Sequence, residues 1–416
     1  MKKIIINGRF LLHRVTGVER YAREMVNALD ELTAPGQLEI AVPPEVNELP
    51  EWKNITVRRV GGLHNRMWEH FSFPAYVRRQ GGIALNLCNV APLPAPGIVT
   101  IHDMKPIVHP EYYSEKFVLW YRLLFRNAFQ RARMVLTVSK FSAREIRRYY
   151  RIDPHRISIT PEGWQQFGRL EYDEYALERY GLEKGGYYFS MGSRDPAKNL
   201  SWVIESARAN PEMIYAISGN VNREIFADSG VDLEKTASGC GRRNDGATGC
   251  EAGNKGIGSG CEPGNNGIGP EGETGNKGAG SGCEAGNKGI GPGHESGNSG
   301  IGSGRDSKQI PENVRFLGYV RDEEAKTLMR DCKAFLFPSF YEGFGLPPLE
   351  ALSAGCPCVV VSDIPVMHEL FEDEAVYVDP YKVEEFTCRK PDAEKILKKY
   401  SWKKSARKLL RILESV

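Results

Sequence analysis

The sequence predicts an α/β protein with two doubly wound parallel-sheet domains, the second of which carries a disordered, glycine-rich insert. The chain has 416 residues, which is more than one hydrophobic core usually serves. Short β-rich runs alternate with longer amphipathic runs, as in parallel sheets covered by helices. Residues 239–304 hold 24 of the 44 glycines, so this stretch stands apart from both domains.

The first domain is expected to span residues 1–165. Strands are predicted where short apolar runs are rich in β-branched residues, at residues 3–6, 98–101 and 135–138. A helix is predicted at residues 21–32. Ser142 is placed as the cap of a further helix, because Glu145 follows it three positions later.

The second domain is expected to span residues 166–383, after a hinge within residues 163–185. Its predicted strands are residues 187–191, 213–217, 314–316, 334–337 and 358–361. In a last segment, residues 384–416, Ser401 is placed as the cap of a helix with one apolar face. We expect this segment to pack back toward the first domain.

The insert at residues 239–304 repeats an eleven-residue unit that starts at Glu251, Glu262, Glu273, Glu284 and Glu295. So much glycine is costly to order, and one Ile or Ala per unit offsets little of that cost. A metal site or small solenoid that uses the recurring Cys and His positions is the alternative. Because the insert follows a predicted helix at residues 223–235, we expect it at the sheet edge opposite the ligand cleft.

Charge and hydropathy exclude several classes of protein. Lys and Arg total 55 against 53 Asp and Glu, so a formal charge of +2 gives no reason to expect a nucleic-acid partner. No apolar run approaches the length of a membrane span or of a secretory signal core. The sequence therefore predicts a cytoplasmic protein whose nine cysteines are thiols.

Candidate binding residues follow the predicted strands, because ligands of open α/β sheets bind where strands end and helices begin. After the strand at residues 187–191, Arg194 and Lys198 lie in a turn of small residues before a helix. Two cations in that position suit a diphosphate. A solvated Arg/Lys pair at a helix start is the alternative and is at least as common.

A second candidate site follows the strand at residues 334–337. Glu342 and Glu350 flank Gly343 and Gly345, so a tight turn can expose backbone amides between two carboxylates. Carboxylates suit the vicinal hydroxyls of a sugar or ribose, and amides suit anionic oxygens. A plain strand, turn and helix would explain Glu350 through the helix dipole, but it would not explain Glu342 with its glycines.

The segment from Glu342 to Glu350 resembles the E-x7-E signature of retaining glycosyltransferases of the GT-B fold, in particular the bacterial mannosyl and rhamnosyl group 1 transferases of family four. Further motifs match in the order of that family: NGRFL at residues 7–11, TGVERY at 16–21, TIHD at 100–103, VSKFS at 138–142, NVRFLGYV at 313–320 and YSW at 400–402. Together they cover nearly all of the chain outside the insert. The resemblance implies two Rossmann-like domains that face a cleft.

The resemblance also implies which residues act on the transferred sugar. Glu342 would contact the sugar or its phosphate side, and Glu350 would hold the ribose of the donor. His102 would face the donor sugar from the first domain. The alternative for His102 is a structural imidazole at a strand end.

The remaining candidates would bind the rest of the donor. By resemblance, Arg194 and Lys198 would bind the diphosphate together with the backbone amides of Phe344, Gly345 and Leu346. Gly17 would lie in a turn that meets the diphosphate and the acceptor, and Gly318 would border the base. The family often has Arg directly before the Lys, where this chain has Ala197.

The implied reaction moves a hexose, with retention of anomeric configuration, from a nucleotide diphosphate sugar such as GDP-mannose. The acceptor would be a glycan or a lipid-linked oligosaccharide in bacterial surface polysaccharide or lipopolysaccharide synthesis. The sequence has no D-x-D triplet, so we expect no metal and no cofactor beside the donor, with cations and amides in their place. A non-catalytic nucleotide-sugar-binding scaffold and an isomerase or phosphorylase on the same fold are the alternatives.

A cationic stretch bears on the acceptor and on localisation. It comprises Lys140, Arg144, Arg147, Arg148, Arg151 and Arg156, interleaved with apolar and aromatic residues. A solvated helix face is one interpretation. Peripheral contact with anionic lipid on the inner membrane face is the other, and it would suit a lipid-linked acceptor.

Overall fold

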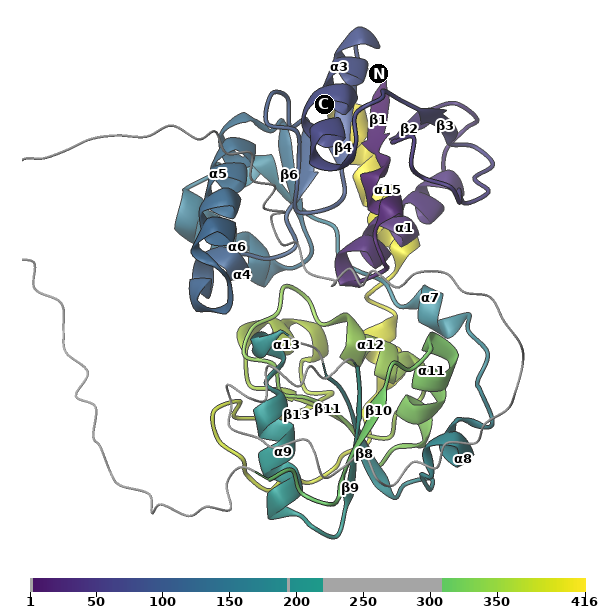
Figure 1. Ribbon diagram of the computed structural model, residues 1–416, viewed down its shortest axis with the longest axis vertical. Coiled ribbons are helices and arrows are strands. Elements are labelled where there is room, and N and C mark those ends of the chain that lie inside the picture. Colours follow the sequence, from purple (N-terminus) through teal and green to yellow (C-terminus); the bar gives the residue numbers. More distant parts are fainter. Residues whose placement is uncertain (1–2, 193–194, 220–308) are drawn as a thin grey trace, which may run out of the picture.

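Apolar, β-branched runs form two fully parallel sheets, each in its own α/β domain, and this confirms the predicted fold class. The computed structural model describes residues 3–192, 195–219 and 309–416. Figure 1 shows the two domains with the first above the second. The predicted helix at residues 223–235 and the insert at residues 239–304 lie outside the described residues.

The first sheet has seven strands in an order that reverses direction at β1. Across the sheet they are β3 (Thr56–Arg59), β2 (Leu38–Val42), β1 (Ile4–Asn7), β4 (Ile83–Asn86), β5 (Ile98–Thr100), β6 (Met134–Thr137) and β7 (Ile157–Ile159). Ile4 pairs with Leu38 on one side and with Ile83 on the other. The strand order therefore switches between β1 and β4, where open α/β sheets bind ligands.

The second sheet has six strands and reverses at β8. Its order is β10 (Val314–Gly318), β9 (Ile214–Ser218), β8 (Tyr187–Met191), β11 (Ala334–Phe337), β12 (Val359–Ser362) and β13 (Val376–Val378). All four residues of β11 are buried, as expected for a strand covered on both faces. The switch point of this sheet lies between β8 and β11.

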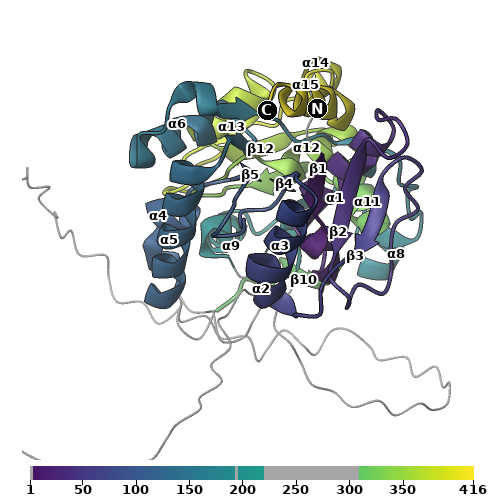
Figure 2. The ribbon, with the colours of Figure 1, turned by 90° about the horizontal axis from the view of Figure 1, so that it is seen from above.

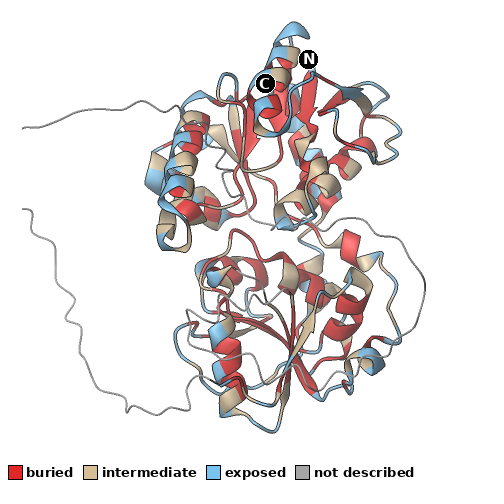
Figure 3. Cartoon of the chain, viewed as in Figure 1, coloured by how far each residue is buried: buried red, intermediate tan, exposed pale blue. Residues whose placement is uncertain are grey.

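Helices cover both faces of each sheet, so that buried residues lie inside each domain and exposed residues outside (Figure 3). Those of the first domain are η1 (Gly8–Leu12), α1 (Gly17–Asp30), α2 (Asn65–Met67), the π-helix η2 (Trp68–Ser72), α3 (Phe73–Arg79), α4 (Lys105–Val108), η3 (Pro110–Tyr112), α5 (Glu115–Arg131), α6 (Lys140–Tyr150) and η4 (Pro154–Arg156). The described helices that follow are α7 (Gln165–Gly168), α8 (Ala176–Tyr180), η5 (Pro196–Lys198), α9 (Leu200–Ala209), α11 (Asp322–Asp331), α12 (Leu346–Ser353), α13 (Pro365–Phe371), α14 (Ala393–Leu397) and α15 (Trp402–Ser415).

Two helix starts differ from the prediction. Helix α1 begins at Gly17 and not at residue 21, because Thr16 and Glu19 form a capping box. Helix α6 is capped by Ser139 and not by Ser142: the Ser139 hydroxyl accepts the backbone N–H of Ser142 at 3.0 Å. Both serines fit the sequence pattern, but Ser139 holds the extended backbone that a cap needs.

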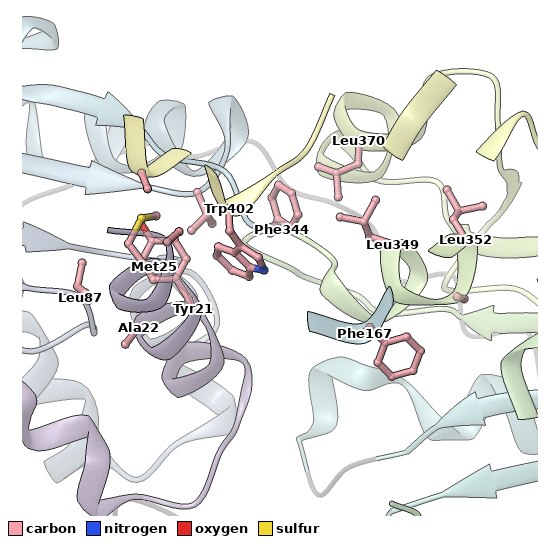
Figure 4. Packing of buried hydrophobic residues seen from close by; sticks show 14 of the residues in the cluster. Tyr21, Ala22, Met25, Leu87, Phe167, Phe344, Leu349, Leu352, Leu370 and Trp402 are labelled. Atoms are coloured by element: carbon pink, nitrogen blue, oxygen red, sulfur yellow. The ribbon is translucent and has the colours of Figure 1, made fainter. Parts of the chain in front are cut away.

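The last helix returns to the first domain, so the two domains are joined by it as well as by the chain that follows β7. Helix α15, capped at Ser401 as predicted, packs against α1 of the first domain. Trp402 is buried, and its ring centroid lies 5.7 Å from that of Tyr21. Figure 4 shows Trp402 between Tyr21 of α1 and Phe344 of the second domain. The two domains therefore share a continuous apolar core at this contact.

A polar contact also joins the two domains. Viewed from above in Figure 2, α6 of the first domain lies beside α13 of the second. The carboxylate of Glu369 in α13 accepts the backbone N–H groups of Lys140 and Phe141 at 2.6 and 2.8 Å. A carboxylate at a helix N-terminus is favourable because it satisfies free N–H groups and complements the dipole.

Candidate active site

The carboxyl edges of the two sheets face each other across the interdomain cleft. The hydroxyl of Ser139, just after β6, donates to the carbonyl of Gly343, just after β11, at 2.7 Å. The Tyr341 hydroxyl accepts the backbone N–H of Met104 at 3.2 Å. These bonds bring the turn that contains Glu342 against the loop that contains His102.

Gly343 is required by this close approach. A Cβ at residue 343 would lie 2.5 Å from the carbonyl oxygen of His102, closer than real Cβ atoms come. The Ser142 hydroxyl donates to the same His102 carbonyl at 2.9 Å. The predicted residues His102 and Glu342 therefore belong to two loops that touch.

His102 is buried, and both of its ring nitrogens face polar groups of its own domain. Nε2 lies 3.0 Å from the carbonyl oxygen of Leu87, and because a carbonyl can only accept, Nε2 carries a proton in this arrangement. Nδ1 lies 3.8 Å from Oε1 of Glu162. The ring also stands edge-on to Tyr21, with centroids 4.7 Å apart. These contacts fix the orientation of the ring.

Glu342 and Lys198 are brought together as an ion pair. Nζ of Lys198, at the end of η5, lies 2.6 Å from Oε1 of Glu342. The same ammonium lies 4.7 Å from the centre of the Phe337 ring, where a cation is attracted to the π-face. Arg194, the predicted partner of Lys198, lies outside the described residues.

Lys105 is a second cation in the cleft that the sequence interpretation missed. Its ammonium bonds to the carboxylate of Asp195 in the second domain. Although burial opposes it, the carboxylates of Asp103, Asp195 and Glu342 raise the pKa of Lys105. Lys105 therefore stays charged beside the Lys198–Glu342 pair. Its position three residues after His102 could have indicated that Lys105 also lies in the cleft.

Glu350 lies in the first turns of α12 and is buried beneath the cleft. Its Oε1 accepts an N–H of Gln166 at 2.9 Å, and the carbonyl oxygen of the same amide accepts the indole N–H of Trp402 at 2.6 Å. A guanidinium nitrogen of Arg20 lies 4.0 Å away. Burial raises the pKa of Glu350 to about 7, and Arg20 limits the shift.

Glu162 lies between His102 and the Lys198–Glu342 pair in its electrostatic interactions, and it was not predicted from the sequence. It follows β7 at the same carboxyl edge, and it is buried beside His102. Burial raises the pKa of Glu162, while its interaction with His102 opposes the shift. Its charge also interacts with those of Glu342 and Lys198. The signal was Glu162 in the turn just after a short run at residues 157–159, but no strand was predicted there.

The remaining predicted residues lie at helix starts and at a strand end of the two domains. Phe344, Gly345 and Leu346 form the turn into α12, where Gly345 has a φ of 129° that disfavours other residues. Gly17 is the exposed first residue of α1, and Gly318 ends β10. No hydrogen bond or ion pair among the described residues joins Gly17 or Gly318 to the Lys198–Glu342 pair. Their loops approach each other through Arg14, whose guanidinium lies 4.8 Å from the Tyr319 ring centre.

The described residues hold neither a cluster of metal ligands nor a membrane-spanning helix. Within residues 3–192, 195–219 and 309–416, no group of three or more His, Cys, Asp or Glu side chains is arranged to hold a metal ion. In the same parts of the chain, no helix combines the length and the apolar character needed to cross a membrane.

Comparison with known families matches both halves of the chain. Residues 15–164 match the family described as Glycosyltransferase Family 4, and residues 302–414 match the family described as Glycosyl transferases group 1. Together the two matches span more than half of the chain.

Curated relatives carry related names. The chain is 24% identical over 282 residues to the O-antigen chain mannosyltransferase RfbU of Salmonella typhimurium, a match that covers 68% of this chain and 56% of that protein. It is 25% identical over 297 residues to the O-antigen chain mannosyltransferase B of Escherichia coli, which covers 69% and 58%. The chain thus spans a little over half the length of these two relatives.

Solved structures share the fold. Anabaena HepE in complex with UDP-glucose superposes with a TM-score of 0.60 at 13% identity, over all of both chains. WaaG, a glycosyltransferase involved in lipopolysaccharide biosynthesis, superposes with a TM-score of 0.54 at 12% identity, over 97% of this chain and 94% of that one. At these identities the likeness shows the fold alone.

Proposed function

Because this chain belongs to the family four, group 1 glycosyltransferases and has the GT-B fold, we propose that it transfers a hexose from a nucleotide diphosphate sugar to a glycan acceptor. The observation that carries the proposal is the Lys198–Glu342 pair, which meets the His102 loop where the two sheet edges face each other. The relatives named as O-antigen mannosyltransferases favour GDP-mannose as donor and bacterial surface polysaccharide as product.

In the proposed reaction the negative charge of the leaving diphosphate is neutralised by protein groups. Lys198 and Lys105 supply two cations, and the turn at residues 344–346 supplies backbone amides at the start of α12. Such fixed donors in a water-poor cleft stabilise developing charge without reorganisation. This set of groups supports departure of the diphosphate without a divalent cation.

Lys198 and Glu342 would exchange partners when the donor binds. The ammonium would turn toward the diphosphate, and the freed Glu342 carboxylate would accept hydroxyls of the transferred sugar. His102, held by Leu87 and Glu162, would cover the sugar from the first domain. We propose that anomeric configuration is retained, with the departing phosphate accepting the proton of the acceptor hydroxyl on the same face.

The decisive experiment measures nucleotide release from a panel of GDP-, UDP- and deoxysugar nucleotides, with and without lipid-linked glycan. Transfer should require both substrates. His102→Ala and Glu342→Gln should each lower turnover at least a hundredfold, while nucleotide affinity changes less than threefold. Glu39→Gln is the matched control, because Glu39 is a buried carboxylate at the amino end of β2 that pairs with Lys3.

The outcomes separate the alternatives. Nucleotide binding without turnover on any acceptor would favour a non-catalytic binder. Conversion of the nucleotide sugar with no acceptor and no released nucleotide would favour an isomerase. Equal losses of affinity and turnover in His102→Ala would contradict the role given to that ring.

We also propose that the acceptor is lipid-linked and that the protein reaches it through one exposed apolar patch. Four large apolar side chains on α2, η2 and α5 form this patch: Met67, Phe71, Leu119 and Leu123, which are 55%, 54%, 69% and 50% exposed. Elements η2 and α5 meet where the His70 and Trp120 rings lie 5.8 Å apart. Exposed apolar side chains of this size, grouped together, typically mark an interaction surface.

Charge favours an anionic membrane surface as the partner of the apolar patch. Helix α5 exposes Lys116, Arg122 and Arg126 around Leu119 and Leu123, and its one acidic residue is Glu115. Basic residues around apolar side chains are favourable at an anionic bilayer surface. The basic helix α6 fits this role less well, because Ile146 is fully buried in the domain core and Tyr149, at 42%, is its one strongly exposed large apolar side chain.

Liposome pelleting tests this surface. Binding to vesicles with phosphatidylglycerol should fall at least fivefold in Leu119→Glu/Leu123→Glu and should weaken at high salt. The comparison variant Arg144→Glu/Arg147→Glu changes α6 and should retain most of the binding. Loss only in the α6 variant would place the contact there.

A further inference from the structure

We propose that a cavity in the first domain binds one uncharged sugar unit of the acceptor. This inference rests on the proposed transferase function and specifies the substrate class that its acceptor side selects. The cavity measures about 230 Å³ and lies between the loops after β1 and β4 and the start of α1. It therefore occupies the switch point of the first sheet.

The cavity adjoins the candidate active site through one loop. Leu87, Cys88 and Asn89 line the cavity. The Leu87 carbonyl also faces Nε2 of His102, and the Asn89 side chain accepts the backbone N–H of His102 at 2.7 Å. A sugar seated in the cavity would thus lie beside the loop that fixes His102, where its hydroxyl can approach the donor.

The floor of the cavity is a prearranged polar network. Glu69, held by the π-helix η2, is only 4% exposed. It accepts the side-chain N–H of Asn7 at 2.9 Å and a guanidinium N–H of Arg9 at 3.2 Å. Asn7 also donates to Asn86 at 3.0 Å. Each side chain is held by its neighbours, so the network costs little further ordering when a ligand binds.

The network has capacity left for a ligand. Nε of Arg9 is buried without a hydrogen-bond partner among the described residues. Oε1 of Glu69 accepts from Asn7 and Oε2 accepts from Arg9, and a carboxylate oxygen can accept more than one hydrogen bond. An unsatisfied buried donor beside a carboxylate suits the vicinal hydroxyls of a sugar. Phe10, Val90 and Tyr121 add apolar lining for the C–H faces of the ring.

The charge of the cavity selects against anionic sugars. Its lining contains one permanent cation, Arg9, and two carboxylates, Glu19 and Glu69. Burial and the nearby Arg9 lower the pKa of His13, so that side chain adds no positive charge near neutral pH. A phosphate or a uronate would therefore meet excess negative charge, whereas an uncharged hexose would not.

Saturation-transfer NMR without donor tests the cavity directly. The probes are methyl α-mannopyranoside, methyl glucuronide and mannose 6-phosphate. The neutral glycoside should show saturation transfer, and the two acidic sugars should bind at least tenfold more weakly. Glu69→Gln should lower neutral-sugar affinity at least tenfold, while Glu39→Gln should leave it unchanged.

A second variant covers the case in which Glu69→Gln does not fold. Val90→Trp fills the cavity from a half-buried position without removing a charge. It should abolish sugar binding while nucleotide affinity stays within twofold. Preferred binding of an acidic sugar, or unchanged neutral-sugar binding in a folded Val90→Trp protein, would overturn the proposal. Failure of the wild type to bind any nucleotide would instead refute the transferase function, because the NMR assay needs no donor.

Discussion

Glu350 is predicted to lower the stability of the empty protein at neutral and higher pH. Burial raises its pKa from 4.5 to about 7, and each unit corresponds to about 1.4 kcal/mol. As pH rises from 4.5, the unfolded chain ionises first, so the folded state loses relative stability until pH exceeds 7. Above that pH the accumulated loss amounts to about 3 kcal/mol.

Glu350→Gln removes this charge and keeps the oxygen that accepts the N–H of Gln166. The variant should therefore unfold at higher urea than the wild type at pH 8, by up to about 3 kcal/mol. Near pH 4.5 the two proteins should unfold alike. The affinity for nucleoside diphosphate should fall about tenfold, because the variant loses a charged acceptor for the ribose.

A control of opposite sign is available in α11. Burial alone would raise the pKa of Glu324, but the backbone N–H and the charge of Arg321 lower it overall. Glu324→Gln should therefore destabilise the protein at pH 8. A Glu350→Gln protein that is less stable than the wild type at pH 8, or whose difference does not change with pH, would refute this reasoning.

Three further predictions concern the cleft and the insert. Lys198→Ala should weaken nucleoside diphosphate binding at least tenfold by calorimetry while nucleoside binding is kept, because the lost cation faces the phosphates; equal losses for both ligands would contradict that placement. Glu162→Gln should remove the ionisation that its raised pKa places on the acidic limb of the kcat profile, and an unchanged pH profile would exclude Glu162 as the group that titrates there. Deletion of residues 239–304 should leave transfer within threefold of the full chain, and a folded but inactive deletion would show that the insert belongs to the site.

The sequence predicted the central strands of the second sheet well because they are buried on both faces. Residues 187–191 and 334–337 were placed with correct bounds, since apolar, aromatic and β-branched runs of this kind fit a covered parallel strand. Five strands were missed. Strands β3, β7 and β13 are short, and none of their residues except Val378 is buried, so the apolar signal is weak. Strands β2 and β4 were missed although every residue in them is buried.

Site residues were predictable where one loop carries the chemistry. Glu342 and Lys198 each follow a central strand, and the structure pairs them. Glu162 and Lys105 were missed because their partners lie far along the chain. Glu162 meets His102 across 60 residues, and Lys105 meets Asp195 across 90. Such contacts depend on how strand ends meet in space, which local pattern does not encode.

The return of α15 to the first domain has a consequence during protein synthesis. Helix α1 buries Tyr21, Met25 and Leu29, and α15 is the helix that packs on it from the far end of the chain. At roughly 5–20 residues per second, the ribosome takes on the order of half a minute to make the intervening residues. For that time the apolar face of α1 lacks its final cover. We expect nascent chains that end before α15 to be substrates for chaperones that bind exposed apolar helices.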